Sequence, residues 1–166
     1  MTSIAIFGGS GYAGDHIRTE ATSRGIEVIS VSRSGGAETR TGSITDQALV
    51  TELAREADVL VVATPPTPAL ESIDGLIAAA IAGHSRIGVV GGAGSLLVSE
   101  GGPRLVDTPD FNEEWKAGAL EHAEVLDALR AAPAELDWFY SARPRCSGPG
   151  PRGRRPAATG PAARSC

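Results

Sequence analysis

A glycine-rich segment directly after the first apolar run is the feature that most constrains the fold of this 166-residue chain. The run at 3–7 reads Ser-Ile-Ala-Ile-Phe, and Gly-Gly-Ser-Gly-Tyr-Ala-Gly follows at once at 8–14. Gly8, Gly11 and Gly14 fit Gly-x-x-Gly-x-x-Gly, and the second glycine of the segment also starts a Gly-x-Gly-x-x-Gly pattern. Glycine permits a tight turn from a strand into a helix and lets another group approach the backbone closely. A buried strand, a glycine turn and a helix are therefore predicted for the start of the chain.

Apolar runs and helical periodicities alternate along residues 1–140. The runs are short and apolar at nearly every position, which is typical of strands covered by helices on both faces; they span 3–7, 26–31, 58–63, 86–90 and 136–140. Apolar residues recur at helical spacing between them, at 13–21, 49–53, 70–81 and 115–129. Strands that alternate with helices of this length form βαβ units. The pattern predicts an α/β fold of Rossmann type, a doubly wound parallel sheet in three αβα layers.

Two segments break this alternation. Residues 91–111 form a connection of about 20 residues, and connections this long in compact domains are often lids over a site. Residues 141–166 hold six Arg, five Pro and no acidic residue, and they contain no Val, Ile, Leu, Met or aromatic residue. They cannot bury enough apolar surface to offset the entropy of ordering the chain. We therefore predict a folded domain over 1–140 and a disordered tail over 141–166.

The composition of the tail also has a genetic interpretation. Arg, Pro, Gly and Ala use GC-rich codons, and an out-of-frame reading of a high-GC gene would give such a sequence. A frameshift or truncation near residue 141 is the interpretation that we favour. The alternative is a natural basic tail that contacts an acidic partner.

Charge, hydropathy and cysteine usage exclude several classes of protein. The formal net charge of −5 argues against a generally basic surface for nucleic acid. The longest uncharged apolar run, at 76–82, is far shorter than the ~20 residues that span a bilayer. Both cysteines, Cys146 and Cys166, lie in the tail, and no CxxC or other metal-ligand spacing occurs. The chain is predicted to be a cytoplasmic protein that binds no membrane, no nucleic acid and no metal.

The glycine segment and the end of the second strand together indicate a dinucleotide. Backbone N–H groups of a glycine turn, with the N-terminus of the following helix, favour a pyrophosphate. An acidic residue at the end of the second strand would bond the ribose 2′-hydroxyl of NAD. Here the strand ends Val-Ser-Arg-Ser, and Arg33 can clamp a 2′-phosphate with Ser32 as a further donor. The sequence predicts NADP(H) rather than NAD(H).

Four segments resemble those of one family, the NAD(P)H-binding atypical short-chain dehydrogenases/reductases. They are the glycine motif, the Val-Ser-Arg strand end, Gly-Ser-Ile-Thr-Asp at 42–46 and Asp-Val-Leu-Val-Val-Ala-Thr-Pro-Pro at 58–66. The resemblance is greatest to the NmrA-like group, which includes small flavin-reductase-like proteins. Segments 89–95 and 105–116 are similar to a bacterial oxidoreductase branch of it. The resemblance covers about residues 3–140 and implies an NAD(P)-binding Rossmann domain.

The resemblance also implies which residues surround the cofactor. They are Gly8, Ser10, Gly11, Tyr12, Gly14, Ser32, Arg33, Ala63, Thr64, Pro65, Gly91 and Gly92. Ser43 stands where family members usually have an Asp that helps to fix the adenine, so that contact is predicted to be weaker or missing.

The sequence carries less evidence on catalysis. The Tyr-x-x-x-Lys pair of typical short-chain dehydrogenases is absent. Ser95, after the fifth expected strand, and Lys116, the sole lysine, are the two catalytic candidates. His16 and His122 are interpreted as exposed helical positions, and a third histidine, His84, as the end of a helix.

Three functions fit these residues. The first is a reductase that moves a hydride to a small molecule such as a flavin, a quinone or a carbonyl compound, because the cofactor carries that chemistry. The second is a non-catalytic redox sensor that binds NADP(H). The third is an epimerase-type isomerase with a tightly held cofactor. The sequence indicates neither the substrate nor the oligomeric state.

Overall fold

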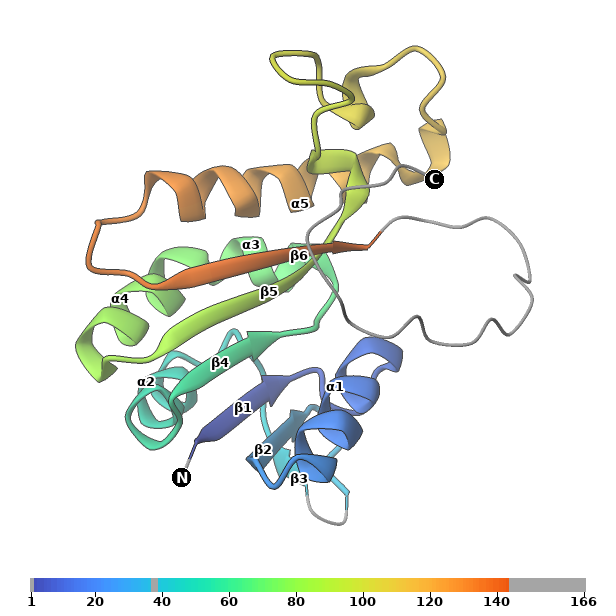
Figure 1. The fold of residues 1–166 in the computed structure, drawn as a ribbon. Coiled ribbons are helices and arrows are strands. Elements are labelled where there is room, and N and C mark those ends of the chain that lie inside the picture. The colour runs from blue at the N-terminus through green and yellow to red at the C-terminus, as the bar shows by residue number, and fades with distance from the viewer. Residues whose placement is uncertain (1, 37–38, 144–166) are drawn as a thin grey trace.

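The computed structural model describes residues 2–36 and 39–143 (Figure 1). The strands are β1 (Ser3–Phe7), β2 (Glu27–Ser32), β3 (Thr39–Thr41), β4 (Val59–Val62), β5 (Arg86–Gly92) and β6 (Trp138–Arg143). The helices are α1 (Tyr12–Ser23), α2 (Gln47–Glu56), α3 (Pro66–Glu71), α4 (Ile73–Gly83) and α5 (Glu113–Ala131). Two short 3₁₀ turns, η1 (Ala93–Ser95) and η2 (Leu105–Asp107), lie between β5 and α5.

The six strands form one sheet in the order β3-β2-β1-β4-β5-β6, and every neighbouring pair is parallel. The chain runs outward from β1 to β3, then returns to the other side of β1 and continues outward to β6. The strand order therefore reverses between β1 and β4, which is where doubly wound sheets bind their ligands. The predicted Rossmann-type fold is confirmed.

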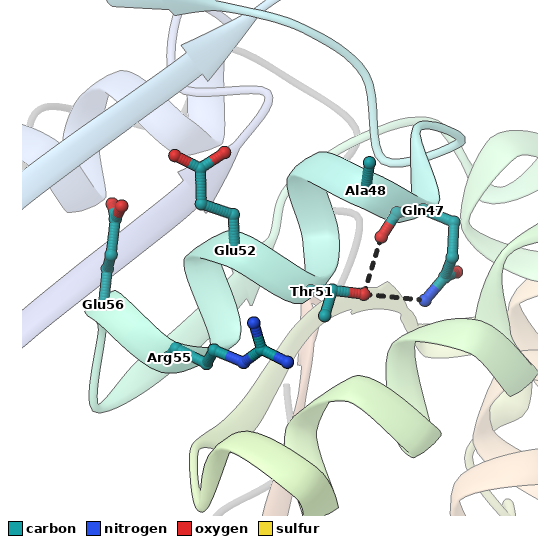
Figure 2. A pocket seen from close by; sticks show the side chains of 6 residues that line it. All are labelled: Gln47, Ala48, Thr51, Glu52, Arg55 and Glu56. Carbon is teal, nitrogen blue, oxygen red and sulfur yellow. Dashed lines mark hydrogen bonds between the residues drawn. The ribbon is translucent and has the colours of Figure 1, made fainter.

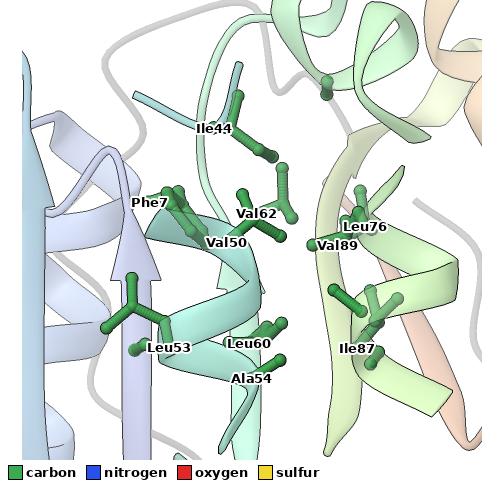
Figure 3. Packing of buried hydrophobic residues seen from close by; sticks show 14 of the residues in the cluster. Phe7, Ile44, Val50, Leu53, Ala54, Leu60, Val62, Leu76, Ile87 and Val89 are labelled. Atoms are coloured by element: carbon green, nitrogen blue, oxygen red, sulfur yellow. The ribbon is translucent and has the colours of Figure 1, made fainter. Parts of the chain in front are cut away.

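Helices cover both faces of the sheet. On one face, Ala21 of α1 packs on Ile4, Ile6 and Val61. On the other face, a larger apolar cluster joins β1, β4 and β5 to α2, α4 and α5. Figure 3 shows Phe7, Leu60 and other labelled side chains of this cluster pointing toward one another between the strands and α2 and α4. The strands are apolar at consecutive positions because both of their faces are covered.

Helix ends follow the local sequence. The Asp46 side chain accepts hydrogen bonds from the backbone N–H groups of Ala48 and Leu49 at 3.1 and 3.2 Å, which makes it the N-cap of α2. The outward face of α2 carries polar side chains, and Thr51 bonds back to the Gln47 carbonyl at 2.7 Å (Figure 2). His84 ends α4 in the left-handed region with φ of 57°, which confirms its predicted position at a helix end.

The structure differs from the sequence prediction at three places. Strand β3 was not expected, because Thr-Arg-Thr has no apolar pattern. The expected helix at 70–81 is divided into α3 and α4 at Ser72. Strand β6 continues to Arg143, three residues beyond the expected boundary of the folded domain. The rest of the predicted disordered tail, 144–166, lies outside the described residues.

The connection between β5 and α5 is ordered rather than structureless. It contains η1, η2 and an isolated antiparallel bridge between Leu97 and Arg104. Among the helices that the structure describes, none has the length and apolar character needed to cross a membrane. Residues 2–36 and 39–143 also contain no cluster of three or more His, Cys, Asp or Glu side chains that could hold a metal ion.

Candidate functional site

The glycine loop lies between β1 and α1, at the point where the strand order reverses. Gly8 has a φ of +84°, and a Cβ there would lie 2.6 Å from the Ala63 carbonyl oxygen. Its N–H and that of Gly9 both donate to the Val31 carbonyl, at 3.0 and 3.2 Å. The loop is therefore held against the ends of β2 and β4, and glycine is required at position 8 by both conformation and space.

The other two motif glycines have different roles. A Cβ on Gly14 would overlap the Gly8 carbonyl oxygen, so Gly14 allows α1 to pack directly on the loop. A Cβ on Gly11 would meet the same oxygen at a close 3.2 Å, and no other non-neighbouring atom of the described residues lies within 4 Å of it. Space beside Gly11 is thus left open by the protein. Gly11 is also the N-cap of α1 and provides no capping side chain, so the helix N-terminus faces this space without one.

A cavity of about 600 Å³ opens at this loop. Its size lies in the range of small-molecule sites. Of the residues predicted to contact a cofactor, those that line it are Gly8, Ser10, Gly11, Ser32, Arg33, Ala63, Thr64 and Pro65. Seven further residues line the cavity. The sequence did not single out six of them for binding, namely Phe7, Val31, Gly42, Ile44, Thr45 and Pro68; the seventh is Ser43.

Four predicted contact residues do not line the cavity. Gly14 is buried beneath the loop, and Tyr12 is 69% exposed, with its ring centroid 4.5 Å from that of His16. Gly91 and Gly92 lie at the end of β5, two strands away from β1 in the sheet. The cavity is therefore one half of the predicted site, and the end of β5 is the other.

The charge of the cavity is positive on the side of β2. Arg33 is exposed and is the only charged residue among the described residues of the lining, which include no carboxylate. The hydroxyl of its neighbour Ser32 donates to the Gly35 carbonyl at 3.3 Å. Ser43 accepts hydrogen bonds from the backbone and the hydroxyl of Thr45, at 3.2 and 2.9 Å. Among these described lining residues, an anion near the end of β2 would meet one guanidinium and no carboxylate.

A second depression, on the outward face of α2, has no such features. Its walls are side chains of this single helix (Figure 2). Two of them, Glu52 and Glu56, form ion pairs with Arg40 of β3, at 3.0 and 3.1 Å. Gln47 donates to the Gly75 carbonyl at 3.1 Å. These contacts join α2 to its neighbours, β3 and α4, and give the depression a structural role.

A hydrogen-bond network marks the end of β5. The Gly92 N–H and the Ser95 hydroxyl both lie 3.2 Å from the Tyr140 hydroxyl oxygen, and Ser95 also donates to the Gly92 carbonyl at 2.9 Å. The Tyr140 hydroxyl lies 3.3 Å from the His122 carbonyl of α5. Ser95 is only 2% exposed. The network joins β5, η1, α5 and β6, and it engages the Ser95 hydroxyl within the protein.

The His122 side chain departs from its predicted position. The sequence indicated an exposed helical residue, but the imidazole is partly buried, and its Nδ1 has no hydrogen-bond partner among the described residues. Burial lowers the pKa of His122 below its ordinary 6.5, and the neighbouring Glu121 carboxylate acts in the opposite direction. The expectation was wrong because α5 packs on η1, which helical periodicity alone does not reveal. His16, by contrast, is exposed as predicted.

The second catalytic candidate, Lys116, lies in the first turn of α5. Its ammonium forms an ion pair with Glu113 at 2.7 Å, and its side chain is 40% exposed. The ion pair accounts for the position of Lys116 without a substrate.

Comparison with known proteins agrees with this architecture. No family model matches the chain. The uncharacterized protein YwnB of Bacillus subtilis strain 168 is 34% identical over 148 residues, which are 82% of this chain and 69% of YwnB. The solved structure of a "putative NADH-flavin reductase" from Streptococcus pneumoniae is 32% identical, with a TM-score of 0.72 over 84% of this chain and 70% of that one. A "putative exported protein" from Burkholderia pseudomallei is 30% identical, with a TM-score of 0.72 over 84% and 71%.

The parallel sheet, the glycine loop at its switch point and these similarities define an NAD(P)-binding Rossmann protein of the reductase/epimerase superfamily. Within it, the chain belongs to the family of YwnB and the flavin-reductase-like proteins.

Proposed function

We propose that this chain is an NAD(P)H-dependent reductase that binds NADP(H) through the glycine loop at 8–14. The observation that carries the proposal is the cavity at this loop, where Arg33 is the only charged side chain among the lining residues that the structure describes. The Streptococcus protein named above as an NADH-flavin reductase supports the same class of activity. The substrate is then a small molecule such as a flavin, a quinone or a carbonyl compound.

The residues present fit a dinucleotide. The open space beside Gly11 would admit a pyrophosphate that any larger residue would displace. The uncapped N-terminus of α1 would stabilise its negative charge, because the helix dipole is positive at that end. Ala63, Thr64 and Pro65 would contact the cofactor at the end of β4. When bound, the nicotinamide supplies a hydride, and the protein supplies orientation and exclusion of water.

The preference for NADP(H) over NAD(H) rests on the end of β2. The guanidinium of Arg33 is exposed at the cavity and could bond a 2′-phosphate in a bidentate manner. NAD-binding proteins of this fold usually place a carboxylate there, and the lining has none within 2–36 and 39–143.

The test is the substitution Arg33→Ala with both cofactors titrated by calorimetry. Charge-assisted hydrogen bonds contribute about 1.5–3 kcal/mol, so NADPH binding should weaken about 10- to 150-fold. NADH lacks the 2′-phosphate and should lose little. The control is Arg24→Ala at the end of α1, since Arg24 pairs with Glu20 and does not line the cavity. If the affinities for NADPH and NADH fall equally, Arg33 supports the local structure rather than the 2′-phosphate. If neither affinity changes, Arg33 is a surface residue without a role in binding.

A redox sensor remains the second candidate because the chain lacks the Tyr-x-x-x-Lys pair. An assay of NADPH oxidation with menadione, FMN and aldehydes distinguishes it. Tight NADPH binding without turnover of any acceptor would favour the sensor. The epimerase-type alternative draws on one neighbour, a "putative epimerase" from Bacteroides thetaiotaomicron that is 26% identical with a TM-score of 0.71. Interconversion of a sugar nucleotide without net NADPH oxidation would favour it.

Three finer predictions accompany the proposal. They are membership of the NmrA-like group, a cytoplasmic location, and a frameshift or truncation near residue 141. Resequencing the coding region tests the last. An uninterrupted reading frame in independent isolates would contradict the frameshift and favour a natural basic tail.

A further inference from the structure

Gly92, at the end of β5, borders a space that the His122 side chain approaches. Among the atoms of the described residues, the non-neighbouring ones within 4 Å of a Cβ built on Gly92 are two of the His122 ring, Cδ2 at 3.4 Å and Cγ at 3.9 Å. The imidazole therefore forms the near wall of the space above this strand end. Parallel strands of doubly wound sheets present their ligands at this edge.

The position of the imidazole is fixed by close packing of α5 on η1. A Cβ on Gly94 of η1 would lie 2.8 Å from the Ala119 Cβ of α5. The two elements therefore touch at Ala119, which lies about one helical turn before His122. The Tyr140 hydroxyl lies 3.3 Å from the His122 carbonyl and joins α5 to β6 as well. These two contacts fix α5 against η1 and β6, and thereby hold the His122 ring beside Gly92.

The other candidate groups at this strand end are engaged within the protein. The Ser95 hydroxyl is buried and bonds to Gly92 and Tyr140. The Tyr140 hydroxyl interacts with three groups, and Lys116 is paired with Glu113. The Nδ1 atom of the His122 imidazole, by contrast, has no hydrogen-bond partner among the described residues. Its ring is the group at this end of β5 that can give or take a proton near neutral pH.

We propose that His122 donates the proton in the reduction of a carbonyl compound, such as a quinone, bound over Gly92. This inference rests on the reductase function proposed above. Reduction of a quinone to its hydroquinone takes up one hydride, with its two electrons, and one proton; the bound nicotinamide would supply the hydride, and a quinone oxygen receives the proton. The imidazolium N–H bond breaks as the O–H bond forms, and the neutral imidazole regains a proton from water.

The electrical surroundings of His122 set the direction of its pH dependence. From its own helix, the Glu121 carboxylate raises its pKa, and burial lowers it by more. The elements packed against α5 are α3, α4, β5, η1 and η2, and their charged residues are Glu71, Asp74, Arg86 and Asp107. The charged group that acts on the His122 pKa is the Glu121 carboxylate, which itself accepts a hydrogen bond from Thr67 of α3 at 2.9 Å. The net lowering leaves the imidazole mostly neutral at pH 7, so the rate should rise as pH falls below about 6.5.

The substitution His122→Asn tests the proposal in the full chain, with NADPH oxidation by menadione measured between about pH 5 and 8. A general acid typically contributes about 10²–10⁴ in rate, so we expect a loss of about 100-fold or more at low pH and a flat pH profile. NADPH affinity should stay within about twofold. The control is His84→Asn, because His84 is exposed at the end of α4 and Asn tolerates its left-handed backbone. His84→Asn should keep both the rate and the profile.

A second measurement does not depend on turnover. NADP⁺ at saturation should shift the imidazole NMR signals of His122, assigned by their absence from His122→Asn, and leave those of His84 unchanged. If NADPH does not bind the unsubstituted chain, the proposed function itself fails. If it binds but His122→Asn keeps the pH profile, or NADP⁺ leaves the His122 signals in place, the inference alone is overturned. Bound NADPH that reduces no menadione also overturns it.

Discussion

Substitution of Gly11 by valine should mainly weaken NADPH binding, whereas substitution of Gly14 should mainly lower the unfolding free energy. Gly11 has φ of −78° and ψ of 166°, an extended conformation that valine adopts without backbone strain. A Cβ there would lie 3.2 Å from the Gly8 carbonyl oxygen, a tight contact that requires this oxygen to move by a few tenths of an ångström. We expect Gly11→Val to fold with a smaller loss of stability than Gly14→Val. Gly14→Val places a Cβ against backbone atoms of Gly8 and Gly9 that cannot move separately from the loop. Overpacking of this kind costs about 1–3 kcal/mol of unfolding free energy.

The binding effect of Gly11→Val follows from the space that it fills. A valine there would occupy the position beside the N-terminus of α1 where we place the pyrophosphate. Loss of one hydrogen bond from a backbone N–H to a charged phosphate costs about 1.5–3 kcal/mol, or about 10- to 150-fold in affinity for NADPH. Thermal unfolding and calorimetric titration measure the two quantities separately. Wild-type NADPH affinity in a folded Gly11→Val protein would refute the placement of the site at this loop.

Three further outcomes are expected. Gly91→Ala would overlap the Tyr140 ring, so it should lower the unfolding free energy by about 1–3 kcal/mol; an unchanged urea midpoint would contradict this close approach. Asp46→Ala removes the N-cap of α2 and should cost about 1 kcal/mol, measured by the same denaturation, whereas Asp46→Asn should cost much less. The lowered pKa of His122 means that unfolding takes up a proton, so stability should fall as pH drops below about 6.5, and His122→Asn should remove that part of the dependence.

The elements that the sequence predicted well are those with a local signal. Continuous apolar runs identified β1 and β4, and the glycine segment identified the turn that the structure places at the switch point. The N-cap of α2 is also a local feature, because an acidic side chain directly before an apolar helix, here Asp46, can accept hydrogen bonds from the free backbone N–H groups. The long helix α5 follows apolar residues at helical spacing.

The features that the sequence missed depend on distant contacts. Strand β3 has no apolar alternation, and its pairing with β2 is visible only in the sheet. The burial of His122 comes from the packing of α5 on η1, and the network at Tyr140 needs β6 beside β5. The pattern of glycines in β5 could have given a hint. Gly91 leaves room for the Tyr140 ring, and glycines inside a buried strand often mark the close approach of another group.

The most direct test of the central claim is a calorimetric titration of the full 166-residue chain with NADPH and, separately, with NADH. The glycine loop and the Arg33 guanidinium predict saturable binding of one NADPH per chain, tighter than NADH by about tenfold or more because of the 2′-phosphate. Tighter binding of NADH would contradict the assignment of Arg33. The absence of saturable binding with either nucleotide would contradict the claim that this cavity is a dinucleotide site.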